Sequence, residues 1–540
     1  MFNHRIINHL NIYFLGLILI AVSLPLSKFV LSVSIFILLG NWILEGEFKR
    51  KLNILKSRIS VLIFSLIVII HIVWLLKTGD IQSGLHDIQI KSPLLALPLI
   101  IGTSRGLDKK QISIILLFFI AAVTVASLII AFIFFGFSGI EADSIKEASV
   151  FISHIRFSLM VNVAIFILAI FVFDNLYFNP SVIGKIIFIL GLLWLIIFLV
   201  LFQTLTGIVI FAIIGYSMVM KSVYGIKDHI IRFLWFVLLI GIIPVSLVLI
   251  HGEIVNYYNV EEVNPDSLTL YTSNNNLYHH NLNRKEIENG KYVWIYVCED
   301  EISKEWNKRS KFNYGGYDLK GQEIKFTLVR FLTSKGLRKD SVAIWKLSNN
   351  DVHNIEKGIA NYIYSDKFSA KALIYRIIWE FDSYSKGLNP SGHSLTQRIE
   401  YWKTGLKLTR KNFWLGVGTG DLQVAFNKQY EDDNSVLDRD WRLRAHNQFL
   451  TFFIAFGIFG FLICVFAIFA PVIFEKKYYD TVFMIVFFIG ILSFFNEDTL
   501  ETHTGATFFA FFYALLLFGL KNQSAVHSPQ SAVHSIQKSK

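Results

Sequence analysis

The stretch SLTQRIEYWKTGLKLTRKNFWLGVGTGDLQVAFNKQYEDDNSVLDRDWRLRAHNQFL runs from Ser394 to Leu450 and ends where a long apolar run begins. It is polar and rich in arginine. Ser394 followed three residues later by Gln397 is typical of a capping box, which predicts a helix that starts there. We expect this helix to continue to about Thr409. The stretch is therefore predicted to be a helical polar segment that leads directly into an apolar helix.

Two side chains of the first predicted helix share a face, because Arg398 and Trp402 are four residues apart. The glycines that follow, among them Gly416 and Gly418, predict a tight turn, and a second, shorter helix is expected from Asp421. The sequence GVGTGD contains GxGxG but follows no apolar strand of a βαβ unit, which argues against a dinucleotide-binding loop. A turn is the preferred interpretation, with backbone amides facing a bound group as the alternative.

The composition is that of a membrane protein. Of 540 residues, 54% are hydrophobic and 17% are charged, with 50 Phe, and the mean hydropathy is +0.52. The net charge of +11 does not indicate nucleic-acid binding, because the polar region 251–445 is near charge balance and the surplus lies in short loops. Cys298 and Cys464 lie in a polar and an apolar region, so we do not expect them to pair. The sequence has no metal-ligand motif, and we predict no cofactor.

Twelve apolar runs are candidates for membrane spans, since a span needs about 20 apolar residues. The run that contains Pro93 and Pro98 is short. If any of the twelve runs is re-entrant or broken, we expect it to be this one. No small-residue cleavage site follows the first run, so we expect it to be a retained span. The runs lie near 9–25, 27–45, 58–77, 92–104, 112–136, 153–173, 182–202, 204–221, 230–250, 447–474, 479–495 and 503–520.

Basic residues in the short loops predict how these runs are oriented. Lys and Arg concentrate after the second, fourth, eighth and tenth runs and in the C-terminal tail, all on one side of a twelve-helix arrangement. By the positive-inside rule both termini are then cytoplasmic, and 251–445 faces outward, into the periplasm if the cell has one. The predicted fold class is an all-α polytopic membrane protein with a large, mainly helical periplasmic domain between helices 9 and 10.

Four regions follow from this arrangement. They are a membrane region 1–250 with nine helices, a periplasmic domain 251–446 that contains the segment 394–446, three membrane helices in 447–520, and a disordered cytoplasmic tail 521–540.

Within the outward region the pattern changes along the chain. We expect 251–290 to be irregular, and the alternation in KYVWIYV, from Lys291, predicts a strand. Residues 323–380 are expected to be mostly helical, with one helix capped by Asn350 or Asp351.

Arg398 and His446 are the first candidates for a functional site. The planar, always charged fork of Arg398 suits phosphate oxygens, and the alternative is an arginine that is exposed or paired with a carboxylate. His446 precedes the apolar run, where a neutral imidazole can accept a proton from a hydroxyl. The alternative for His446 and Asn447 is that their side chains cap the helix that follows.

Further candidates lie near the predicted outward surface. Arg156, at the start of the sixth run, either grips an anionic group or extends along the apolar surface to reach water. Glu497, Asp498 and Glu501, in the loop FNEDTLETHTG, offer carboxylates for acid–base work or a divalent ion. Capping of helices and pairing with arginines near His446 are the more ordinary roles for them.

The order of these motifs resembles the O-antigen ligase and O-antigen polymerase superfamily of integral-membrane glycosyltransferases. The resemblance rests on SLTQRIEYW, GVGTGD and RAHNQFLTFFIAFGIFG, with NEDTLETHTGATFFAFFYALL similar to the last helices of ligase-like members. It covers about 391–520, and the N-terminal helices agree only in number and layout. The outward region is longer than is usual in the family, which leaves the acceptor open.

The resemblance implies a GT-C-like fold in the bacterial inner membrane and an active site on the periplasmic side. The donor would be a glycan on undecaprenyl diphosphate and the acceptor the lipid A-core of lipopolysaccharide, with inversion and without a metal or cofactor. Arg398 matches the family's arginine and His446 its histidine, while Arg156 is assigned to a second essential arginine. Arg442 and Arg444 are assigned to the diphosphate beside them. Trp402, Gly416, Gly418, Asn447 and Glu497 are assigned supporting roles.

Three functions remain distinct at this point. The first is a ligase, and the second is a relative that transfers the glycan to a protein hydroxyl, as an O-oligosaccharyltransferase, or to a growing chain, as a polymerase. The third is a transporter for lipid-linked glycans. The large outward domain and the polar motifs on one face do not suggest the inverted repeat or midplane site of a transporter.

Overall fold

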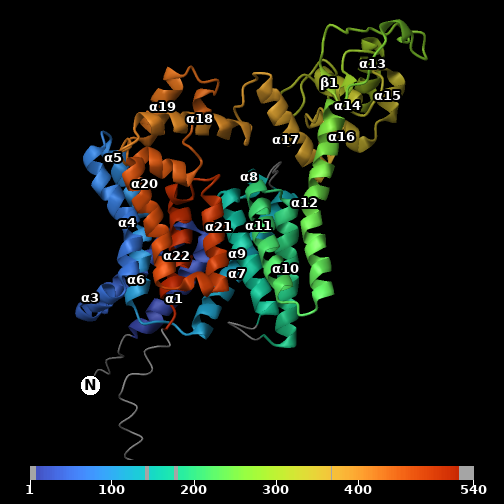
Figure 1. The fold of residues 1–540 in the computed structure, drawn as a ribbon. Coiled ribbons are helices and arrows are strands. Elements are labelled where there is room, and N and C mark those ends of the chain that lie inside the picture. The colour runs from blue at the N-terminus through green and yellow to red at the C-terminus, as the bar shows by residue number, and fades with distance from the viewer. Residues whose placement is uncertain (1–7, 140–144, 175–179, 367, 522–540) are drawn as a thin grey trace, which may run out of the picture. The chain divides into compact units, whose positions relative to one another are not determined.

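The computed structural model describes residues 8–139, 145–174, 180–366 and 368–521 (Figure 1). The described chain is mostly helical and divides into two compact units, one of residues 1–219 with 391–540 and one of residues 220–390. The predicted segment 394–446 lies in the first unit. The predicted tail lies outside the described residues from Asn522 onward, and the division of the chain at the membrane surface stays a prediction.

The first unit is a helical bundle whose elements come from both ends of the chain. Its helices are α1 (His9–Leu26), α2 (Lys28–Leu44), α3 (Phe48–Ser57), α4 (Ile59–Val73), η1 (Trp74–Lys77), α5 (Ile81–Lys91), α6 (Pro93–Thr103), α7 (Lys109–Phe134), α8 (Ile145–Ala148), α9 (His154–Phe173), α10 (Val182–Leu201), α11 (Leu205–Tyr224), α18 (Thr396–Lys411), α19 (Leu422–Asp432), η4 (Arg439–Trp441), α20 (Gln448–Phe474), η5 (Lys477–Tyr479), α21 (Thr481–Ser493), η6 (Thr499–Glu501) and α22 (His503–Phe518). The end of α11 crosses into the second unit.

Each of the twelve predicted apolar runs coincides with a helix. In the part of the chain that the structure describes, eight helices are long and apolar enough to cross a membrane, or nine if α2 and α3 form one bent span. The helices α21 and α22 are apolar but shorter, and α6 has only 11 residues. The protein is therefore a multi-pass membrane protein, and the number twelve stays a prediction.

Segments far apart in sequence interleave in the core of the first unit. Helix α4 packs against α20, and α6 packs against α22, so the N-terminal and C-terminal parts close one bundle. Helix α22 is buried along almost its whole length, as its run of small and aromatic residues requires. This pairing brings the polar loop before α22 to the same end of the bundle as α5 and α18 (Figure 1).

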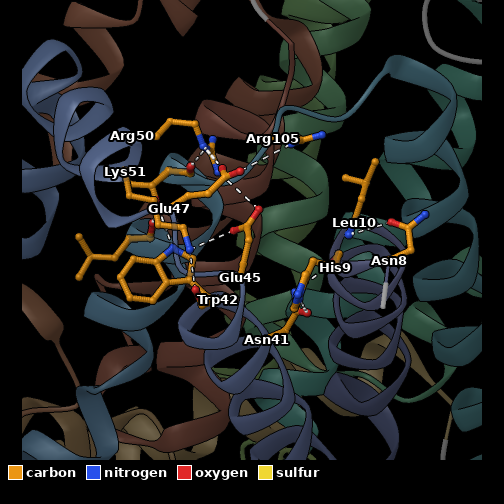
Figure 2. A network of polar contacts seen from close by, with 12 residues as sticks. Asn8, His9, Leu10, Asn41, Trp42, Glu45, Glu47, Arg50, Lys51 and Arg105 are labelled. Atoms are coloured by element: carbon orange, nitrogen blue, oxygen red, sulfur yellow. Dashed lines mark hydrogen bonds and ion pairs between the residues drawn. The ribbon is translucent and has the colours of Figure 1, made fainter. Parts of the chain in front are cut away.

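A charged elbow joins α2 to α3 at the end of the bundle that lies opposite α18 and α19 (Figures 1 and 2). The two helix axes differ by 107°. Lys51, buried in this elbow, lies 3.0 Å from Glu45 and donates to the carbonyl of Trp42. Its ammonium also lies 4.6 Å from the centre of the Trp42 ring. The elbow is thus held by one fully partnered buried cation.

The second unit consists of α12 (His229–Tyr258) and a small domain with its own core. The remaining elements are η2 (Pro265–Ser267), β1 (Ile287–Glu288), β2 (Lys291–Tyr292), α13 (Glu299–Arg309), α14 (Ile324–Ser334), α15 (Ser341–Lys346), α16 (Asn349–Glu356), η3 (Tyr362–Ser365) and α17 (Ala370–Ser385). The core centres on Trp306 and the apolar face of α14, with residues such as Ile324, Leu328 and Leu332.

The structure corrects several expectations in this unit. The strand expected from KYVWIYV is only two residues long, because beyond Tyr292 the chain bends and its buried side chains pack onto α14 instead of pairing with a strand. The irregular start expected at 251 is helical, since α12 continues to Tyr258. The helical content of 323–380 is confirmed, but α16 is capped by Ser348.

Candidate active site

Helix α18 positions Arg398, although the expected capping box is wrong. The helix begins at Thr396, after Leu395, which makes no side-chain capping bond. The Ser394 carbonyl accepts a hydrogen bond from Nη1 of Arg398 instead. The arginine thus supplies the polar contact at this helix start, and its side chain is largely buried, with 13% of its surface exposed.

The glycine turn after α18 seats this helix against α20. The amides of Val417 and Gly418 donate to the carbonyls of Ile454 and Ala455, at 2.8 and 2.9 Å. Gly416 has a φ of +65°, and a Cβ there would lie 2.3 Å from the Ala455 oxygen. These two amides are therefore already bonded to α20, as expected of a structural turn.

Helix α20 is broken where the turn meets it. Gly457 has a φ of 63° and a ψ of −169° inside the helix, and a Cβ there would lie 2.3 Å from the carbonyl of Trp414. The carbonyl of Phe413 accepts the amide of Ile458 at 2.8 Å. The glycine turn and the break in α20 thus contact each other directly, and their backbone hydrogen bonds fix the position of α18 along α20.

The expected second helix is present as α19, and Asp421 precedes it. The Asp421 side chain does not cap α19 but accepts the amides of Gly79 and Asp80, both at 2.8 Å. The polar segment is thereby fixed to the connection between α4 and α5.

His446 lies at the junction of this segment with α20 and has a left-handed backbone, with a φ of 45°. A non-glycine residue in this region is uncommon and costs free energy unless its surroundings enforce it. Asp498 enforces it, because this carboxylate accepts the amides of His446 at 3.1 Å and Asn447 at 2.8 Å. The Asn447 side chain caps α20 by accepting the amide of Leu450 at 2.9 Å. Of the two proposed capping residues, only Asn447 does so.

Glu497, the residue before Asp498, contacts both Arg398 and His446. Its Oε1 accepts a hydrogen bond from Nη2 of Arg398 at 2.7 Å, and its Oε2 lies 3.6 Å from Nδ1 of His446. Burial alone would raise the pKa of the Glu497 carboxyl, but His446 and Arg398 outweigh it and hold that pKa below its ordinary value. The ring of Tyr401, one helical turn after Arg398, stacks on the His446 ring with centroids 5.5 Å apart.

Three nitrogen atoms of this cluster are buried without a hydrogen-bond partner. They are Nε of Arg398, Nε of Arg156 and Nδ1 of His446. Arg156, on α9, interacts electrostatically with Glu497 and Asp498, so all three predicted residues converge on the loop between α21 and α22. Buried donors without partners are rare in proteins, and here they gather at one point.

A second charged cluster lies next to the first. Lys91, at the end of α5 and fully buried, lies 2.8 Å from Glu501, and Arg444 lies 3.3 Å from the same Oε2 atom. The other oxygen of Glu501 accepts Nε2 of Gln448 at 3.0 Å. Burial alone would raise the pKa of Glu501, but Lys91 and Arg444 hold it at about 2. Asp87, one turn before Lys91, lies 3.7 Å from it, and burial raises the pKa of its carboxyl.

Sequence reasoning missed Lys91 and Asp87 as members of the site. A lysine directly before a short proline-containing apolar run was the available signal for Lys91. Nothing in the sequence indicates that this lysine pairs with a carboxylate more than 400 positions away.

The remaining predicted residues are placed as follows. Nε of Arg442 donates to the carbonyl of Leu437 at 3.1 Å, and its own carbonyl accepts Nε2 of Gln423 at 3.0 Å. Trp402 is on α18 with 37% of its surface exposed. Among the described residues, no group of three or more His, Cys, Asp or Glu side chains is arranged to hold a metal ion.

One protein family matches the part of the chain that contains α18 and the start of α20. Residues 362–465 match the family model described as O-antigen ligase. The resemblance to the O-antigen ligase superfamily is thereby confirmed. The matched segment includes Arg398, the glycine turn, Arg444 and His446, whereas Arg156 and Glu497 lie outside it. No curated protein matches the chain.

Proposed function

We propose that the protein is an O-antigen ligase-like glycosyltransferase, which moves a glycan from undecaprenyl diphosphate to the lipid A-core of lipopolysaccharide. The observation that carries this proposal is the convergence of Arg398, His446 and Arg156 on Glu497, with Arg398 and His446 inside a segment similar to O-antigen ligases. The three residues come from α18, the start of α20 and α9. Their meeting at one polar end of an apolar bundle suits a substrate with a charged head and a lipid tail.

The arginines bind the diphosphate of the donor. Their planar guanidinium groups donate paired hydrogen bonds to phosphate oxygens. The buried Nε–H groups of Arg398 and Arg156 have no acceptor among the described residues, so they are available to the diphosphate. Arg444, which shares Glu501 with Lys91, and Arg442 extend this cationic surface. As the bond between the anomeric carbon and the diphosphate oxygen breaks, the leaving group keeps the electron pair, and the arginines stabilise its charge.

His446 acts as the general base. With its Nδ1 proton directed at Glu497, the neutral ring presents Nε2 to a hydroxyl of the acceptor. The hydroxyl oxygen attacks the anomeric carbon from the side opposite the diphosphate while His446 takes its proton, so the configuration inverts. Glu497 then stabilises the imidazolium that forms.

Glu497 also counters Arg398 until the donor binds. A buried arginine without a counter-ion is costly, and the 2.7 Å contact with Glu497 removes that cost in the free enzyme. Binding of a diphosphate gives Arg398 new acceptors, which frees the Glu497 carboxylate for His446. From the distribution of basic residues in the loops, we infer that this site lies on the periplasmic side of the inner membrane and that both termini lie in the cytoplasm.

The test is complementation of a strain that lacks the gene with the wild type, Arg398→Ala or His446→Ala. Arg410→Ala is the matched control, because Arg410 is exposed on the same helix as Arg398. Outer-membrane glycolipid is separated on a gel beside stains for glycoprotein, and membrane levels of each variant are measured. We expect the wild type and the control to restore long glycan on lipid A and neither site variant to do so.

The other outcomes identify the alternatives. Unchanged lipid A with altered glycoprotein or glycan chain length would move the acceptor to a protein or a growing chain. Full activity of both site variants would overturn the proposed site, and it would favour a transporter if the wild type restores only movement of the lipid-linked glycan.

A further inference from the structure

Helix α3 runs in a different direction from α2, the helix that precedes it. Its axis makes an angle of 107° with that of α2, and two consecutive residues with positive φ, Gly46 and Glu47, form the bend. If α2 crosses the bilayer, a helix at this angle lies along the membrane surface. At 10 residues, α3 is too short to span a membrane in its own right.

One face of α3 belongs to the protein. With about 100° between successive residues of a helix, Arg50, Lys51 and Ile54 project to one side. Lys51 is buried against Glu45 at 3.0 Å, and Arg50 lies 3.4 Å from the same carboxylate (Figure 2). This face fixes the roll of α3 about its own axis, so the directions of its other side chains are determined.

The other two faces are more exposed, although the Phe48 ring lies edge-on to the Trp42 ring with centroids 5.8 Å apart and Leu55 is half-buried against the core of the bundle. Phe48, Leu52 and Leu55 form an apolar stripe, in which Phe48 and Leu52 expose 54% and 53% of their surface. Lys49 and Lys56, both exposed, border this stripe on the side that faces away from Lys51. A narrow apolar stripe edged by lysines is the pattern of a helix that lies in a lipid–water interface.

We propose that α3 binds the surface of an anionic phospholipid bilayer. Leu52 and the exposed part of Phe48 enter the boundary between headgroups and acyl chains, and Lys49 and Lys56 pair with lipid phosphates. Arg105, exposed and 3.9 Å from Glu47, adds positive charge at the same end of the bundle. Charge complementarity selects lipid as the occupant, since the lysines along one edge of the stripe suit lipid phosphates and so short a stripe is too small for a stable protein interface. The proposal is independent of the glycosyl transfer.

The first experiment measures the depth of neighbouring residues in proteoliposomes that contain phosphatidylglycerol. Cys298 and Cys464, both buried, are replaced by alanine, and single nitroxide labels are attached to Leu52→Cys or Asn53→Cys in the full chain. We expect the label at 52 to collide more with oxygen and the label at 53 more with a water-soluble nickel chelate. Equal access to the nickel chelate at both positions would overturn the proposal, and so would a label at 52 shielded from both reagents.

The second experiment tests the charges. We expect phosphatidylglycerol, added to micelles in place of phosphatidylcholine, to raise the Tm of the wild type by several degrees and to raise that of Lys49→Glu/Lys56→Glu much less. The matched control is Lys311→Glu/Lys320→Glu, whose lysines are exposed in the second unit. An equal response of all three proteins would overturn the role of Lys49 and Lys56. Glycan transfer need not be measured, so failure here is distinct from failure of the proposed function.

Discussion

Two of the places where the described bundle of the first unit buries charge differ in how completely that charge is partnered. In the elbow of α2 and α3, the buried Lys51 has a carboxylate, a carbonyl and an aromatic ring as partners. At the candidate active site, Arg398 and His446 share one carboxylate and each keeps a buried nitrogen without a hydrogen bond. Both places have a non-glycine residue in the left-handed region, Glu47 at the bend of the elbow and His446 at the site, so backbone conformation does not distinguish them.

This difference separates structural charge from functional charge. A structural ion pair stabilises the folded state most when every hydrogen-bond donor has an acceptor. A site that binds an anion instead has donors without an acceptor until the anion is bound. We therefore expect changes in the elbow to affect stability and changes at the site to affect activity.

The largest expected effect is on activity. Replacing Arg398 by alanine should lower the transfer rate by about 10³-fold, because a preorganised cation is lost where charge develops on the leaving diphosphate. The rate is measured per folded molecule with purified enzyme in proteoliposomes, because the variant also leaves the buried Glu497 without its arginine and lowers the Tm. A collapse of the Tm with an unchanged rate per folded molecule would make Arg398 as structural as Lys51.

Glu497→Gln should reduce the rate by on the order of 10²-fold, mainly through kcat, because an amide cannot neutralise the imidazolium of His446. The KM for the donor should change less, since a glutamine side chain can still accept from Arg398. Kinetics of Glu497→Gln and Glu497→Asp test this. An effect confined to KM would contradict the positioning role of Glu497.

In the elbow, Lys51→Met should cost about 3 kcal/mol of unfolding free energy, because Glu45 would be left part-buried without its ammonium partner. The double variant Lys51→Met/Glu45→Gln should recover part of that loss. Denaturant unfolding in detergent gives these values, while the transfer rate per folded molecule should stay at the wild-type level. A lower rate at unchanged stability would remove the contrast between the two clusters.

The smallest effect concerns pH. The folded pKa of Glu501 is about 2, against an ordinary value of 4.5, so its ion pairs contribute stability that is complete above pH 4.5 and lost as the pH falls toward 2. The difference in Tm between wild type and Glu501→Gln should thus be constant above about pH 5 and shrink below it. A difference that grows as the pH falls would contradict the pairing with Lys91 and Arg444.

How much of this could be read from the sequence depends on the range of the interaction. Apolar runs report burial over one helix, so all twelve predicted runs coincide with helices, and the arginine and histidine of the polar segment were found from local motifs. The alternation in KYVWIYV misled because burial against α14 gives the same pattern as a strand. The capping box at Ser394 is wrong because α18 begins at Thr396, with Leu395 at the N-cap, and the amide of Gln397 donates to the carbonyl of His393.

The parts of the site that depend on distant pairing were not predictable in the same way. Whether Glu497 bonds Arg398, or Lys91 meets Glu501, depends on how α5, α18 and the loop before α22 are assembled. No periodicity in one segment encodes that arrangement. The left-handed backbone of His446 is likewise imposed by Asp498, which is distant in the chain.

The packing of α22 against α6 has a consequence for biosynthesis. Helix α22 leaves the ribosome after the other helices of the described residues, yet it packs against α6, which was made about 400 residues earlier. Until then the 11-residue α6 lacks its main neighbour, and Lys91 lacks the Glu501 that precedes α22. Nascent chains must therefore keep an unpaired lysine and a short apolar helix from misassembling, and α22 has to be made before the candidate site can form. Ribosome-bound chains that stop before Leu500 should accordingly be substrates for membrane quality control.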